Sequence, residues 1–285
     1  ENPEGMIMAD CNEQGIAMRF IPVCAPAWKN EDGSINEDNI RAFLEQTKKI
    51  CDAQMNGLTQ KQVSDYSEMS IFRSGNDDGV HGEIDWAFYF KMIDSGSFVQ
   101  NGIKMTSGNV YSMDSLAEAL SIPKNEGFEQ LSVGLFDGQS EGVYMPETLT
   151  GINAQSKNVE AAKSFVKLML SEEIQTNTFR GLPVNKAAFE TLLAKYDDTL
   201  EEGYYMMYGG SDQEGNSWFW NAMWFDEEQK QQIRDWAAQA KTPHIVDVTL
   251  EDAVQSVCIE YLKGKLSLDD AVSQVRSKTA IYMSE

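Results

Sequence analysis

Apolar residues recur at helical spacing in several stretches of the chain, each preceded by a residue that favours a helix start. The stretch 151–173 shows this most clearly, because the N-cap residue Asn158 precedes a long apolar stripe. The stripe consists of Val159, Ala162, Phe165, Val166, Met169 and Leu170. Ser171-Glu172-Glu173 then predicts a second helix, with carboxylates at its positive end. The pattern therefore predicts two consecutive helices that end at Gly181-Leu182-Pro183.

The same reasoning predicts helices on both sides of this segment. A helix capped near Asn36 carries on one face Ile40, Phe43, Leu44, Thr47, Ile50 and Cys51. A short helix is predicted over 114–120. Asp226-Glu227-Glu228 begin a helix that turns inward Ile233, Trp236 and Ala237.

Two further helices are predicted at the end of the sequence. Thr249 and Asp252 resemble a capping box at the start of a helix that ends at Gly264. Its stripe is Leu250, Ala253, Val254, Val257, Cys258, Tyr261 and Leu262. Ser267 and Asp270 repeat this start for a last helix, which turns inward Leu268, Ala271, Val272 and Val275.

Three stretches are predicted to be extended: 15–24, 103–111 and 130–136. No internal repeat and no low-complexity tract interrupts the alternation of helical and extended segments. The sequence therefore predicts an α/β or α+β fold that is rich in helix.

The charge of the chain excludes several classes of partner. The chain carries 45 Asp and Glu residues against 23 Lys and Arg residues, a formal net charge of −22. This charge repels phosphate backbones and anionic lipid headgroups, so we expect neither nucleic acid nor a membrane surface as partner. No apolar run approaches the ~20 residues of a membrane span. The opening ENPEGMIMAD is not a signal peptide, so we expect that any export signal was removed or never existed.

The four cysteines are too scattered for a zinc ribbon or a redox pair. Cys51 and Cys258 lie on apolar helical stripes and are predicted to be buried thiols. Cys11 and Cys24 flank a segment predicted to be extended and could pair, because the sequence does not show their separation.

Candidate catalytic and metal-binding residues are few. Gly138-Gln139-Ser140-Glu141-Gly142 matches the G-x-S-x-G nucleophile elbow, but extended chain rather than a helix is predicted to follow Ser140. His244, the only downstream imidazole, could act as a base, yet it follows Pro243 in a predicted loop. His81 and His244 are isolated and no closely spaced cysteine pair exists, so we expect no metal site. No P-loop and no dinucleotide glycine fingerprint is present, so we expect no cofactor. We therefore expect the chain not to be an enzyme.

Aromatic residues beside Asn, Asp and Ser occur in four stretches, and this combination suits a sugar ring. The stretches are Pro26-Ala27-Trp28, residues 85–90, residues 107–111 and residues 217–225. Such aromatics are also common in protein cores. The predicted ligand-binding residues are Tyr111, Asn109, Trp220, Asn221, Trp218 and Trp28.

Three stretches carry a resemblance to a known family. GINAQSKNVEAAKSFVKLMLSEE, followed by GLPVNKAAFE, resembles a strand, helix, helix segment of the extracellular solute-binding proteins of sugar ABC transporters, the maltose-binding-protein-like class. The close, YLKGKLSLDDAVSQVRSKTAIYMSE, resembles the final helix of that family. MTSGNVYSM resembles the family segment that often carries a sugar-stacking aromatic, at or beside Tyr111.

The resemblance covers most of residues 30–285 and implies an α/β periplasmic-binding-protein-like lobe. It assigns residues 1–145 and 198–285 to the second lobe and residues 146–197 to a crossover segment of the other lobe. Most of the first lobe of the family is expected to be missing from this chain.

The resemblance also implies a function. Proteins of this family capture a carbohydrate outside the cell, close by a hinge motion and dock on a membrane permease. It implies export to the periplasm or, in a Gram-positive host, tethering by an N-terminal lipid. Two alternatives stay open: a glycan-binding or scaffold module that does not serve transport, and a serine hydrolase that uses Ser140.

Overall fold

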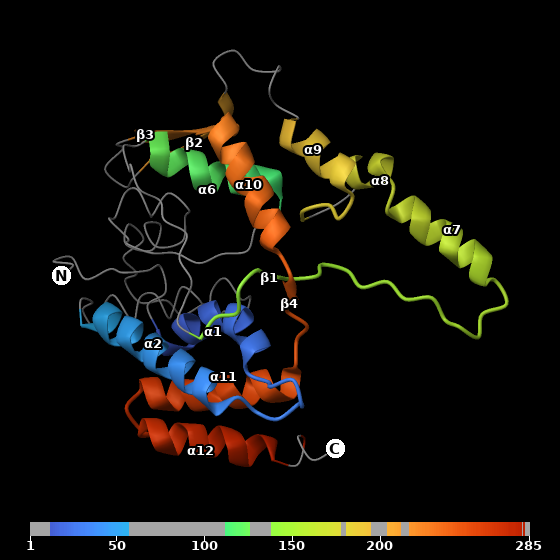
Figure 1. Cartoon of the computed structure of the whole chain (residues 1–285). Coiled ribbons are helices and arrows are strands. Elements are labelled where there is room, and N and C mark those ends of the chain that lie inside the picture. Colours follow the sequence, from blue (N-terminus) through green and yellow to red (C-terminus); the bar gives the residue numbers. More distant parts are fainter. Residues whose placement is uncertain are drawn as a thin grey trace, which may run out of the picture. The chain divides into compact units, whose positions relative to one another are not determined.

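The computed structural model describes residues 12–56, 112–125, 138–177, 181–194, 204–211, 217–280 and 282 (Figure 1). Side chains are not described at residues 119, 122–125, 204–211 and 217–220. The predicted extended stretches 103–111 and 130–136 lie outside the described residues.

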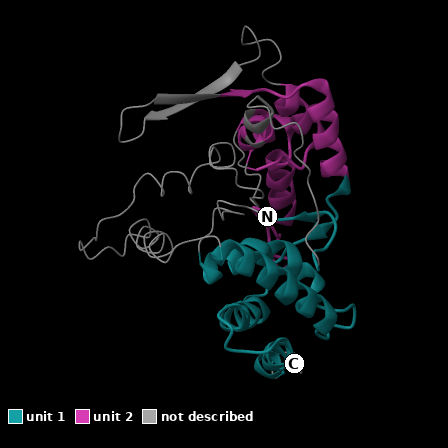
Figure 2. Cartoon of the chain, turned by 90° about the vertical axis from the view of Figure 1, so that its left-hand side faces the viewer, with its two compact units in different colours: residues 1–108, 132–145, 239–285 teal, residues 109–131, 146–238 magenta. Residues whose placement is uncertain are grey.

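The chain divides into two compact units (Figure 2). Unit 1 comprises Glu1–Gly108, Ser132–Met145 and Gln239–Glu285, and unit 2 comprises Asn109–Leu131 and Pro146–Ala238. The chain passes between the units after Gly108, Leu131, Met145 and Ala238.

Unit 1 is built from helices in its described part, with one short pair of strands. The helices are α1 (Glu13–Cys24), the 3-10 helix η1 (Ala25–Ala27), α2 (Glu37–Met55), α11 (Val248–Leu262) and α12 (Leu268–Thr279). The strands β1 (Val143–Tyr144) and β4 (Thr242–Pro243) pair in parallel. Helix α11 packs against α1, α2 and α12, so segments from both ends of the sequence share one core.

Side-chain caps explain where helices α2 and α12 begin. Asn36 Oδ1 accepts the N–H of Asn39 at 3.0 Å, and Ser267 Oγ accepts the N–H of Asp270 at 3.2 Å. Both starts agree with the predicted caps. The predicted stripes of α2, α11 and α12 are buried, except that Tyr261 and Leu268 are only partly buried.

The predicted cap of α11 is wrong by two residues. Asp247 Oδ1 accepts the N–H of Leu250 at 3.1 Å, and Glu251 Oε1 accepts the N–H of Asp247 at 2.9 Å. This reciprocal pair satisfies the backbone N–H groups of Asp247 and Leu250, so the helix starts at Val248.

The prediction of a strand over 15–24 is wrong, because these residues form most of α1. Asn12 caps the helix by accepting the N–H of Gly15 at 2.7 Å. The buried residues of α1 recur at helical spacing: Ile16, Ala17, Phe20, Ile21 and Cys24. Pro22 stands in the last turn, where it removes one backbone donor without ending the helix.

The described part of unit 2 contains helices and one antiparallel pair of strands. Its elements are α6 (Met113–Asn125), α7 (Val159–Met169), α8 (Glu172–Asn177), α9 (Lys186–Ala194), β2 (Tyr204–Ser211), β3 (Ser217–Met223) and α10 (Glu227–Gln239). Strands β2 and β3 pair in an antiparallel register from Ser211 opposite Ser217 to Tyr204 opposite Met223. Helix α6 packs on β3, and the N–H of Met223 donates to Ser121 Oγ at 2.9 Å.

Helix α7 forms as predicted, but its apolar stripe is not buried. Asn158 occupies the N-cap position without a side-chain capping bond. Phe165 is 60% exposed, and Leu168 and Leu170 are exposed as well. In α10, Ile233 is buried and Trp236 is partly buried as predicted, whereas the prediction that Ala237 turns inward is wrong, because Ala237 is exposed. The described residues thus confirm a helix-rich protein with few strands.

Two polar atoms in the core of unit 1 find no hydrogen-bond partner among the described residues: Trp28 Nε1 and Thr47 Oγ1. Trp28 and Thr47 are both fully buried. A buried hydroxyl that lost its water and gained no partner is destabilising.

We predict that Thr47→Val raises the free energy of unfolding by about 1 kcal/mol, because valine keeps the shape and removes the unpaired hydroxyl. Urea unfolding followed by circular dichroism measures this change. The matched control is Thr279→Val: Thr279 is equally buried, but its Oγ1 donates to the carbonyl oxygen of Val275 at 2.8 Å. That variant should lose about 1 kcal/mol. A loss of stability in Thr47→Val would contradict the prediction.

Candidate functional site

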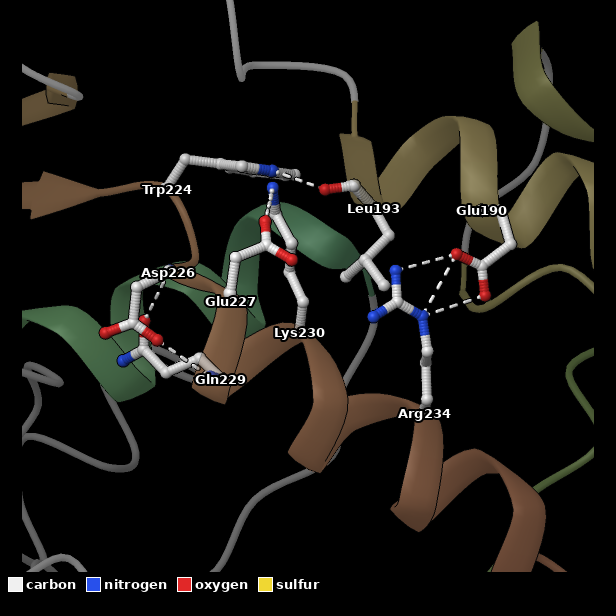
Figure 3. Close-up of polar contacts among 8 residues, drawn as sticks. All are labelled: Glu190, Leu193, Trp224, Asp226, Glu227, Gln229, Lys230 and Arg234. Carbon is white, nitrogen blue, oxygen red and sulfur yellow. Dashed lines mark hydrogen bonds and ion pairs between the residues drawn. The ribbon is translucent and has the colours of Figure 1, made fainter.

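The longest aromatic stretch, residues 217–225, runs along β3 and ends in the core of unit 2. Trp224 and Phe225 are buried, with their ring centroids 4.7 Å apart. The indole Nε1 of Trp224 donates to the carbonyl oxygen of Leu193 at 2.7 Å (Figure 3). This end of the stretch therefore belongs to the hydrophobic core of unit 2.

Polar contacts around the start of α10 hold the same region together (Figure 3). Asp226 and Gln229 form a reciprocal cap, because each side chain accepts the backbone N–H of the other, at 2.8 and 3.1 Å. The guanidinium of Arg234 makes hydrogen bonds to both carboxylate oxygens of Glu190, which ties α10 to α9. Lys230 is buried, and its Nζ lies 3.1 Å from Glu227 Oε1.

The predicted sugar-binding residues differ in how far the structure describes them. Tyr111 and Asn109 lie outside the described residues. Trp218 and Trp220 lie on β3, opposite Gly210 and Tyr208, but their side chains are not described. Asn221 is half-buried and follows them on the same strand.

The assignment of Trp28 to a sugar site is corrected by its burial. Trp28 is fully buried in the core of unit 1 and makes an edge-on contact with Phe43, at 5.1 Å between ring centroids. A ring without an exposed face cannot stack on a sugar.

The loop Gly138–Gly142, which matches the nucleophile elbow in sequence, serves a close backbone approach. Gly138 and Gly142 have φ angles of 83° and 59°. A Cβ atom on Gly142 would lie 1.9 Å from the carbonyl oxygen of Gln239. Strand β1 follows the loop, as the sequence predicts, so Ser140 lacks the helix that an elbow requires.

His244 is buried rather than placed in an open loop. Its ring nitrogen Nε2 lies 3.0 Å from Glu251 Oε1. Its backbone N–H donates to the carbonyl oxygen of Tyr144 at 2.8 Å. Ser140 precedes β1 and His244 follows β4. Because these strands are parallel, the two residues lie towards opposite ends of the pair. The structure therefore does not join them as nucleophile and base.

Asp247, next to this histidine, gathers several polar partners. Its carboxylate pairs with Lys29 and accepts the Tyr282 hydroxyl at 2.9 Å. Burial raises the pKa of Asp247, but hydrogen bonds from Lys29, the Leu250 N–H and Tyr282, with the charge of Lys29, outweigh it and lower this pKa. The hydrogen bond to Asp247 raises the pKa of Lys29. The sequence shows one sign of this cluster, an acidic residue just before an apolar helical stripe.

The described cysteines are buried thiols. Burial raises the pKa of Cys24 to about 12 and that of Cys51 to about 11, and it raises the pKa of Cys258 as well. Burial of Cys51 and Cys258 confirms the prediction, and Cys24 is free. Among the described residues, no group of three or more His, Cys, Asp or Glu side chains could hold a metal ion.

In the described part of the chain, no helix is both long and apolar enough to cross a membrane. No protein-family model matches the chain, and no curated protein matches it.

We predict that Gly142→Ala lowers the free energy of unfolding by about 2–5 kcal/mol. The loss has two causes: the left-handed backbone conformation is unfavourable for alanine, and the added Cβ clashes with the carbonyl oxygen of Gln239. Chemical denaturation of the purified variant measures the loss. Gly33→Ala is the control: Gly33 has a similar φ of 83°, but no atom lies within 4 Å of the added Cβ. This control should lose about 1–2 kcal/mol. Equal losses would show that the approach to Gln239 is not tight.

We predict that Asp247→Asn removes part of the acid sensitivity of the fold. Because the pKa of Asp247 is lowered in the folded state, its stabilising contribution is complete above the unfolded value of about 3.9 and disappears as the pH falls through the folded value. The free energy of unfolding, measured by denaturation between neutral pH and about pH 2, should fall less steeply below pH 4 in the variant. Lys29→Met should have a similar effect, since it removes the cationic partner. If the free energy of unfolding of Asp247→Asn falls below pH 4 as steeply as that of the wild type, Asp247 does not contribute to the acid sensitivity of the fold.

Proposed function

We propose that this protein binds a carbohydrate outside the cell and delivers it to the permease of an ABC transporter. The observation that supports this most is the division into two compact units, between which the chain crosses four times, including the crossings after Met145 and before Gln239. The proposal identifies the chain as part of an α/β periplasmic-binding-protein-like protein, in agreement with the resemblance of residues 151–190 and of the C-terminal segment.

The connection between the units supports a hinge. The carbonyl oxygen of Gly142 accepts the N–H groups of Lys241 and Thr242 at 2.9 and 3.0 Å, next to the paired strands β1 and β4. Two of the four passages of the chain between the units therefore start side by side from unit 1. A pair of adjacent connections permits rotation at little cost, as in proteins that close around a ligand. In the resembled family, ligand binding shifts such an equilibrium towards the closed form.

The proposed ligand site contains Tyr111, Trp218 and Trp220 as stacking residues, with Asn109 and Asn221 as hydrogen-bond partners. The faces of aromatic rings pack on the C–H faces of sugars, and amides bind their hydroxyl groups. A net charge of −22 favours an uncharged ligand over an anionic one. In this proposal the reaction is capture without catalysis, and the protein is periplasmic or held at the cell surface by a lipid.

Titration calorimetry against a panel of neutral mono- and oligosaccharides tests the proposal. We expect saturable binding of at least one sugar, with a decrease in the radius of gyration measured by small-angle X-ray scattering. Binding without compaction would favour a glycan-binding module that does not serve transport. Absence of binding across the panel, with a folded protein shown by circular dichroism, would refute carbohydrate capture.

For the sugar identified by that panel, we predict that Tyr111→Ala or Trp220→Ala weakens binding about five- to hundredfold. This corresponds to the roughly 1–3 kcal/mol of a lost stacking face, at ~1.4 kcal/mol per tenfold change. The melting temperatures of both variants should stay close to that of the wild type.

Trp224→Phe is the matched control, because Trp224 lies in the same stretch but is buried and donates to Leu193. It should lower the free energy of unfolding by about 1–3 kcal/mol and leave sugar affinity unchanged. If instead Tyr111→Ala and Trp220→Ala destabilise the fold and preserve affinity, these two rings belong to the core and not to the site.

A further inference from the structure

No further inference is drawn: the strongest candidate, the exposed apolar face of helix α7 around Phe165 and Leu168 in unit 2, carries nothing because no feature of the described residues shows what covers it.

Discussion

The close approach between Gly142 and Gln239 is the contact on which the architecture of unit 1 depends. At this point the chain has just completed the segment before β1, and it meets the segment that returns from unit 2. Because Gly142 has no side chain, the two backbones can approach closely. The backbone N–H groups of Lys241 and Thr242 can then both donate to the carbonyl oxygen of Gly142. Thr242 Oγ1 adds a bond to the carbonyl oxygen of Glu141 at 2.9 Å. These contacts hold in place the start of the segment that leads to α11, the helix shared by the whole core of unit 1.

Much of the helical structure could be predicted from the sequence because caps and apolar stripes are local signals. Helices α2 and α12 have both signals, and their predicted starts and buried faces agree with the structure. The prediction of a strand over 15–24 was wrong because the apolar residues of this stretch are nearly continuous. Their periodicity therefore could not distinguish a strand from a helix that is buried on one side. Contacts of α1 with α2 and α11 decide in favour of the helix, and no local pattern contains that information.

The candidate site was less predictable, because its residues depend on tertiary environment. Trp28 and Trp224 both stand in polar-aromatic stretches, yet both are buried. The glycines of G-x-S-x-G are compatible with a catalytic turn and with a tight crossing of two backbones, and only the distance to Gln239 distinguishes them. The pairing of His244 with Glu251 is also invisible locally, since seven residues separate them across the end of a strand and the start of a helix.

The interrupted course of unit 1 has a consequence for how the protein folds. Glu141 and Thr242, which bond to each other, are 101 residues apart in sequence, and unit 2 provides most of the residues between them. Contacts at such a separation are slow to form, because a long loop must close before they contribute. During synthesis, α1 and α2 therefore emerge well before α11, with the apolar faces that α11 covers still open to water. In this interval the nascent chain is most exposed to aggregation, and a chaperone would protect it most during the synthesis of unit 2.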